Sequence, residues 1–269
     1  MRRLLSLAAS AAMLASLAPL AAGAQRSENP NAFSWKGNIP AGAWLNVKNL
    51  NGSVRVEQGT GSAAEVTASE SWDEGDPKDV HFIVQHYGAD TANVLICALW
   101  GQNSSCDEDG YHSHGDHRGN DHNDVEVRIV VRLPRGVKVD AGTVNGAVDV
   151  SGATAEVRAH TVNGDVTAST ATGPVSATTV NGSVNAHMDA LSGDGDMRFS
   201  TVNGSVRVDL PAQLDADIDL STVNGGFQTD YPITIDGRFN PRHIRATIGK
   251  GGRRIEARTV NGSVTLRKS

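Results

Sequence analysis

Hydrophobic and polar residues alternate along most of this chain with a period of two, the pattern of half-buried β-strands. Between residues 125 and 133 every odd position is Val, Ile or Leu, and charged residues occupy most even positions. Similar segments run from Ala43 to Leu266, separated by turns rich in Gly, Pro, Asn and Asp. Residues 94–100 are continuously apolar, which predicts a strand covered on both faces. Since residues 25–269 show no sustained helical spacing, the pattern predicts an all-β protein.

One short motif, Thr-Val-Asn-Gly, recurs through the second half of the chain. Its Asn residues are spaced 18, 18, 22, 21 and 37 residues apart, and a variant, Asn-Leu-Asn-Gly, lies upstream at residues 49–52. A period of roughly 20 residues predicts stacked repeats, each too small to bury a core alone. We expect structural turn roles for the Asn-Gly pairs, which are Asn51 and Gly52, Asn145 and Gly146, Asn163 and Gly164, Asn181 and Gly182, Asn203 and Gly204, Asn224 and Gly225, and Asn261 and Gly262.

Two architectures place Asn-Gly at turns. In an antiparallel meander, each pair is the tip of a β-hairpin, because both residues tolerate positive φ. In a β-solenoid, each pair is the corner of a coil, and identical side chains stack at about 4.8 Å. Because the flanking Thr and Val repeat as well, the sequence favours an all-β, β-solenoid or β-helix-like stack of coils of about 18–22 residues. All four Trp residues precede the repeats, so we expect a bulkier N-terminal β section to cap one end.

The chain divides into four segments. Residues 1–24 read as a signal peptide cleaved after Ala24, because two arginines precede an apolar run and small residues end it. No second apolar run is long enough to span a membrane, so we expect a periplasmic or secreted protein. An irregular lead-in is expected at 25–42, an N-terminal β section at 43–136 with a His-rich loop at 101–124, and the repeat array at 137–269. The 37-residue gap is expected to hold two periods, one without the motif.

The repeat and its surroundings resemble a known family. The resemblance rests on three features: the repeated Thr-Val-Asn-Gly-x-Val, the run Val-Arg-Leu-Pro-Arg-Gly-Val at 131–137, and the ending from Ile244 to Gly262. Over about residues 43–267 the chain is similar to the bacterial putative-adhesin β-strand-repeat family of unknown function. The resemblance implies a β-solenoid-like, envelope-associated protein and provides no catalytic residues.

Two features carry candidate chemistry outside the repeats. Cys97 and Cys106 are the only cysteines, and in an oxidising compartment they predict one short-range disulfide. The His-rich tract could bind Zn²⁺, because neutral imidazole is a common ligand of that ion, or it could be a solvated loop. Its candidate ligands are His112, His114, His117 and His122.

Two rows of side chains have two interpretations each. Asp215, Asp217 and Asp219 share one strand face, which could attract Ca²⁺ or could be the solvent side of an amphipathic strand. If the strands stay regular through the motif, the Val of each copy points outward, and these valines would form an apolar stripe for a partner. If a bulge interrupts the strand at Asn-Gly, Val turns inward, and this second arrangement is the one we expect.

Composition limits the function. The formal charge is −6 and no basic stripe is present, so nucleic-acid binding is not expected. Aromatic residues make up 4% of the chain and are nearly absent from the repeats, which disfavours a polysaccharide-active enzyme. We expect a non-catalytic envelope protein with a structural, adhesive or docking role, no cofactor, and an envelope protein, a surface ligand or a second copy as partner. The alternative is a metal-binding or stress-sensing module that uses the His-rich loop and zinc.

Overall fold

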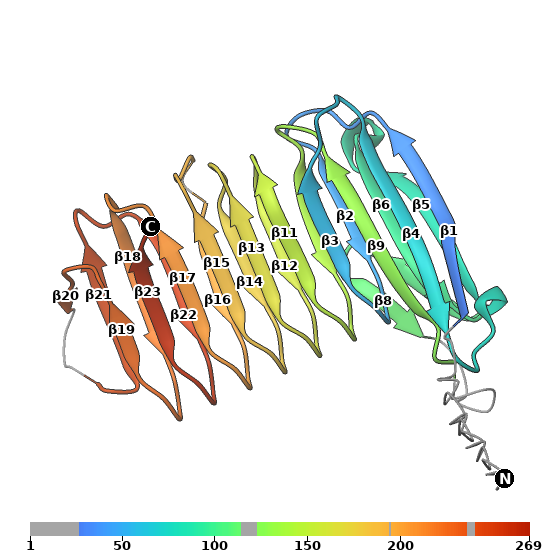
Figure 1. Cartoon of the computed structure of the whole chain (residues 1–269). Helices are drawn as coiled ribbons and strands as arrows, with labels where there is room; N and C mark the ends of the chain where they lie inside the picture. Colours follow the sequence, from blue (N-terminus) through green and yellow to red (C-terminus); the bar gives the residue numbers. More distant parts are fainter. Residues whose placement is uncertain (1–26, 114–122, 194, 236–239) are drawn as a thin grey trace, which may run out of the picture.

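The computed structural model describes residues 27–113, 123–193, 195–235 and 240–269. Its strands form two large sheets that face each other and extend along one common axis (Figure 1). A third sheet is small. We call the 10-stranded sheet sheet A and the 11-stranded sheet sheet B. None of the helices in the described ranges is long and apolar enough to cross a membrane.

The strand order in each sheet follows the axis of the stack. Sheet A contains, in spatial order, β1 (Ser27–Gly37), β4 (Ala64–Trp72), β9 (Glu126–Leu133), β3 (Val54–Gln58), β11 (Val148–Ala153), β13 (Val166–Thr170), β15 (Val184–Met188), β17 (Val206–Leu210), β23 (Val264–Lys268) and β19 (Phe227–Thr229). Sheet B contains β5 (Val80–Tyr87), β6 (Asn93–Trp100), β2 (Trp44–Lys48), β10 (Lys138–Gly142), β12 (Val157–His160), β14 (Val175–Thr178), β16 (Met197–Ser200), β22 (Arg253–Arg258), β18 (Ala216–Ser221), β21 (His243–Ile248) and β20 (Thr234–Ile235). The small sheet pairs β7 (Ser104–Asp107) with β8 (Gly110–Ser113), and two 3₁₀ turns are η1 (Pro77–Asp79) and η2 (Ala89–Thr91).

Each repeat is one coil with a strand in each sheet. The chain leaves sheet B through Thr-Val-Asn-Gly, enters sheet A, and returns through a second turn. Successive coils pair in parallel and in register, so Val157 of β12 lies beside Val175 of β14, and Val166 of β13 beside Val184 of β15. The predicted β-solenoid-like stack is therefore confirmed, and the meander is excluded.

A single apolar core fills the space between the two sheets. In the repeats it consists mainly of Val and Ala, such as Val166 and Ala168, because the alternate residues of each short strand point inward. Larger side chains fill the core where coils are longer, among them Phe199 and Met188. The core continues without a break from Ile39 to Leu266. The N-terminal section and the repeat array therefore share both sheets and one core.

The N-terminal end is closed by antiparallel strands, as expected for a cap. β4 and β1 extend sheet A beyond β9, and β5 extends sheet B beyond β6. The irregular lead-in expected at 25–42 is wrong for residues 27–37, which form β1. Pro30 lies where the register shifts between Asn29 and Phe33, on an edge strand that tolerates a missing N–H. Phe33 and Trp35 pack against the core and hold β1 in place.

At the other end, the spatial order of the coils differs from their order in the sequence. β21 and β20 add antiparallel strands beyond β18, and the chain then turns back. β22 enters sheet B between β16 and β18, and β23 enters sheet A between β17 and β19. The expectation that the gap between Asn224 and Asn261 holds two periods is wrong, because only β19 lies in sheet A while β20, β21 and β22 all lie in sheet B. The last coil in the sequence lies inside the stack.

β6 is covered on both faces, as its continuous apolar sequence predicts. Its inner side chains join the main core, while Leu95, Cys97 and Leu99 pack under the β7–β8 hairpin. The predicted disulfide between Cys97 and Cys106 is confirmed and ties β7 to β6. This hairpin lies in the segment between β6 and β9, whose sequence contains no Asn-Gly pair.

Candidate functional site: the corner rim

The stacked Thr-x-Asn-Gly corners form one continuous edge of the molecule, which we call the corner rim. Its members are residues 143–146, 161–164, 179–182, 201–204, 222–225 and 259–262, with 49–52 as the first corner. The Thr side chains point inward, and their hydroxyls form a row of hydrogen bonds that joins each corner to the neighbouring one. Thr161 Oγ1 donates to the Gly146 carbonyl at 2.9 Å, and Thr179 Oγ1 to that of Gly164 at 2.9 Å. These buried hydroxyls fix each corner against the one before it.

The Asn side chains form an amide ladder on the outside of the rim. Each Nδ2 donates to the Oδ1 of the neighbouring coil at 2.8 Å, in the order Asn224, Asn261, Asn203, Asn181, Asn163, Asn145. All five bonds point the same way along the axis. The ladder ends at Asn145, and in the first corner the Asn51 Nδ2 donates instead to the Val125 carbonyl at 3.0 Å.

Glycine is required in the rim because the coils approach closely there. A Cβ on Gly164 would lie 2.1 Å from the Gly146 carbonyl oxygen, and one on Gly182 would lie 2.0 Å from that of Gly164. Both residues have φ of +155°, which side chains rarely adopt. The Asn-Gly pairs thus serve the stacking of parallel coils, and none of these rim corners is a two-residue hairpin.

The valines of the motif form the apolar stripe on the outside of the rim. Val162, Val180, Val202, Val260 and Val223 are 38–49% exposed and lie in that spatial order. The expected inward turn is therefore wrong, and the strand geometry continues through Val. The bend falls one residue later, because Asn163 and its equivalents are exposed as well. Sequence parity identified this stripe, but the choice between the two arrangements required the backbone path.

A small cavity of about 300 Å³ lies where the tip of the β7–β8 hairpin meets the first coils of the rim. Lys48 Nζ is 2.9 Å from Asp140 Oδ1 and 3.4 Å from His160 Nε2, and His160 Nδ1 is 3.3 Å from the same Asp140 oxygen. Gly142 leaves room for the imidazole, since a Cβ there would lie 2.1 Å from Nε2. Burial opposes ionisation of Asp140, but His160 and Lys48 together hold the pKa of this carboxyl below its usual value.

The row of aspartates near the C-terminal end is divided among different partners. Asp215 accepts from the Lys250 N–H, and Asp217 accepts from the Gly252 N–H. Asp219 is nearly buried and lies 2.9 Å from His243 Nε2, with the side chains of Arg245, Arg254 and Arg258 within 4.0 Å. Burial raises the pKa of Asp219, but the hydrogen bond with His243 and the charges of Arg258 and Arg245 outweigh burial and lower it. The carboxylates are thus engaged in caps and ion pairs, and Asp219 does not face open solvent.

The candidate zinc ligands are only partly within the structure. His112 lies on β8, and its Nε2 is 3.0 Å from Asp107 Oδ1. His114, His117 and His122 lie outside the described residues. In the part of the chain that is described, no three His, Cys, Asp or Glu side chains are grouped as a metal site.

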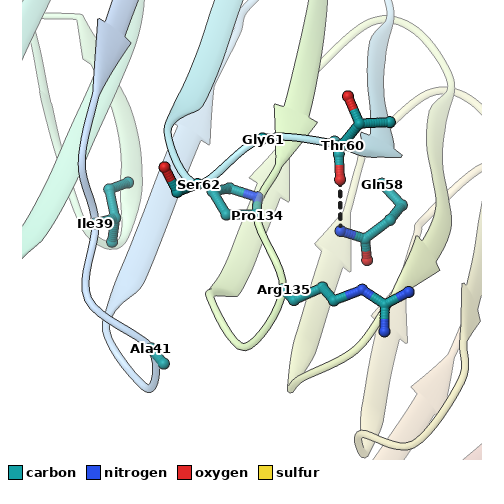
Figure 2. A pocket seen from close by; sticks show the side chains of 9 residues that line it. Ile39, Ala41, Gln58, Thr60, Gly61, Ser62, Pro134 and Arg135 are labelled. Carbon is teal, nitrogen blue, oxygen red and sulfur yellow. Dashed lines mark hydrogen bonds between the residues drawn. The ribbon is translucent and has the colours of Figure 1, made fainter.

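Another cavity lies away from the rim, among the turns at the opposite edge of the N-terminal coils (Figure 2). Its volume is about 670 Å³. Gln58 closes one side through hydrogen bonds from Nε2 to the Gly59 and Leu133 carbonyls at 3.1 and 2.9 Å. Arg135 is the one charged residue of its lining, which otherwise contains Ile39, Ala41, Gln58, Gly59, Thr60, Gly61, Ser62 and Pro134. No acid–base pair converges on this cavity among these lining residues.

The fold and the rim define a β-solenoid-like stack whose repeated corners form hydrogen-bonded ladders. The chain belongs to the Toastrack family, since the family model described as Toastrack DUF4097 matches residues 115–267. The resemblance to a β-strand-repeat family of unknown function is thereby confirmed.

Solved structures of low sequence similarity cover nearly the whole chain. A putative cell adhesion protein from Clostridium sporogenes is 11% identical, with 91% of this chain and 100% of that chain covered and a TM-score of 0.42. A putative adhesin from Bacteroides fragilis is 10% identical, with 91% and 99% covered and a TM-score of 0.36. No curated protein matches the chain. At these TM-scores the likeness carries no argument about function.

Proposed function

We propose that this protein is a non-catalytic envelope protein, periplasmic or secreted, that docks a partner along the corner rim. The observation that carries the proposal is the exposed stripe of Val162, Val180, Val202, Val260 and Val223. A row of half-exposed valines has no role in the core, and contiguous apolar surface commonly marks a partner site. The hydrogen-bonded rows of Asn and Thr side chains join neighbouring corners, which supports a scaffold that holds these valines at a fixed spacing.

The chemistry of the rim supports an uncharged, apolar partner surface. Beside each Val lies a ladder amide, and the residue after each Gly is Ser, Ala or Gly except at Asp165. We therefore propose an envelope protein with an apolar, uncharged face as the partner, and a polyanion fits this rim poorly. The stripe is one side chain wide, well short of the ~800 Å² per partner of a standard interface, so each contact is weak and gains strength from repetition. The rim hydroxyls and amides are engaged in hydrogen bonds, which supports binding over catalysis.

The test uses the mature chain, residues 25–269, immobilised and exposed to solubilised envelope fractions. The stripe variant replaces Val162, Val180 and Val202 by Ser. We expect it to keep its circular dichroism spectrum and lose the captured partner, because these side chains are exposed. A captured protein supports the proposal only if it is identified, and if the purified pair binds and the stripe variant does not.

A matched control changes three exposed residues on the outer face of sheet A in the same coils: Thr167, Asn185 and Arg207, each replaced by Ala. This control should retain the partner. If the stripe variant and the wild type capture the partner equally well, the proposal that the stripe is a docking site is refuted. Self-association of the purified chain that is lost in the stripe variant would replace the envelope partner by a second copy.

A further inference from the structure

The seven Asn-Gly pairs of the rim differ in whether the glycine N–H is hydrogen-bonded. In six of them it donates to the Asn carbonyl of the next coil, at 2.7–3.0 Å, and these glycines are Gly52, Gly146, Gly164, Gly182, Gly204 and Gly262. Gly225 belongs to the last coil along the ladder, and no further coil follows it among the residues that the structure describes. Within the described ranges, the Gly225 N–H has no hydrogen-bond acceptor.

The side chain of Asn224 is also held on one side only. Its Nδ2 donates to Asn261 Oδ1 at 2.8 Å, but its own Oδ1 accepts no hydrogen bond from the residues the structure describes. In contrast, the Oδ1 atoms of the five other ladder residues each accept one. Gly225 is exposed, whereas the six other rim glycines are half-buried or buried. The two residues of this pair are the same as in the other corners, so the difference comes from its place at the end of the stack, where Gly225 also lacks the φ of +113° to +155° of the six other rim glycines.

From this difference we propose that Asn224 is the site at which the folded protein deamidates. The Gly225 backbone nitrogen bonds to Cγ of Asn224, and the Cγ–Nδ2 bond breaks. Ammonia leaves with the proton that the Gly225 nitrogen gives up, and a five-membered succinimide remains. Water then opens the ring at either carbonyl, which yields aspartate or isoaspartate. Glycine favours the closure because it has no Cβ to obstruct it.

The ladder suppresses the same reaction at the inner corners. There the glycine nitrogen is engaged with the neighbouring Asn carbonyl, and the Asn amide is bonded in the ladder, so Cγ cannot swing toward the nitrogen without breaking these bonds. An inner pair must first open locally. Its rate of deamidation is then the rate in the opened state multiplied by the small fraction of molecules that are open. At Asn224 only the bond from its own Nδ2 to Asn261 Oδ1 must break, because the Gly225 N–H and Asn224 Oδ1 have no partner among the described residues.

Deamidation at Asn224 would expose the next corner. The new carboxylate cannot donate to Asn261 Oδ1, and isoaspartate adds a methylene to the backbone, so β19 would separate from β23. Gly262 would then lose the Asn224 carbonyl that accepts its N–H at 3.0 Å. The modification is therefore predicted to advance in spatial order, from Asn224 to Asn261, although Asn203 precedes Asn224 in the sequence.

The experiment is peptide mapping of the intact, oxidised protein during incubation at mildly alkaline pH. Cleavage after Lys and Arg places Asn224 in peptide 208–238, Asn261 in 259–267 and Asn203 in 199–207, with no other Asn in any of them. The conversion of amide to acid should appear in peptide 208–238 about tenfold faster than in 199–207, because the inner corner requires local opening. Peptide 259–267 should follow after a lag.

Two controls decide the cause. In denaturant the three peptides should react at similar rates, because each Asn precedes Gly; a persisting preference for 208–238 would refute an effect of the fold. The Asn224→Gln variant should show no early conversion in peptide 208–238. Similar rates in all three peptides of the folded protein, or earliest conversion at Asn203, would overturn the proposal.

Discussion

The amide ladder predicts that an inner Asn contributes about twice as much stability as the one at its N-terminal end. Asn181 makes two amide–amide bonds, one to Asn163 and one from Asn203, both at 2.8 Å. Asn145 accepts one such bond, from Asn163. A net hydrogen bond is worth about 0.5–1.5 kcal/mol, and these amides are exposed, so the lower half of that range applies. We expect Asn181→Ala to cost about 1–2 kcal/mol and Asn145→Ala about half as much.

The comparison of these two variants removes the effects they share. Both substitutions delete the same side chain from the same corner conformation, so differences in turn preference cancel. Urea unfolding followed by far-ultraviolet circular dichroism gives both free energies, and equal m-values would show that the unfolded states are comparable. The double variant of Asn163 and Asn181 should cost less than the sum of the singles by about one bond, because the two residues share a link. Equal losses for Asn181→Ala and Asn145→Ala, with strict additivity in the double variant, would refute the ladder as a stabilising element.

Three further outcomes are expected. Gly164→Ala should destabilise the fold by about 3 kcal/mol or more in urea unfolding, because its Cβ would lie 2.1 Å from a carbonyl oxygen; Gly42→Ala, with φ of +85° and no atom within 4 Å, should cost only about 1 kcal/mol. Because the pKa of Asp140 is lowered in the fold, its contribution is present above the unfolded pKa of about 3.9 and is lost as pH falls through the folded value. Asp140→Asn should therefore lose less stability than the wild type between pH 5 and pH 2, and an identical loss would contradict this. Reduction of the disulfide between Cys97 and Cys106 should lower the free energy of unfolding by up to about 2–3 kcal/mol, by the chain-entropy estimate. It should also speed amide hydrogen exchange in the β7–β8 hairpin. Unchanged exchange there would show that the disulfide is not needed to hold the hairpin.

Several features of the rim could be read from local sequence. The parity of Val and Thr in the motif placed these two side chains on opposite faces, and the structure has Thr161 buried and Val162 exposed. We expected a bulge at Asn-Gly to turn Val inward; the chain does bend at Asn, but Val precedes the bend and stays on the outside. The ladder follows from identical side chains at strand spacing. The cavity beneath the hairpin tip was not foreseen, because Lys48 and His160 are far apart in the sequence.

The sequence by itself determined the coil and its stacking. A period-two pattern dictates strands, and a motif repeated with its flanking residues allows one coil to lie on the next with every side chain over its equivalent. Only the tertiary structure decided the order of the coils, in which Asn261 lies between Asn203 and Asn224. The physical reason is that identical corners fit one another equally well in any order. The choice is made by long-range antiparallel pairing of β18 with β21, which turns the chain back and leaves one coil-sized place for the last repeat.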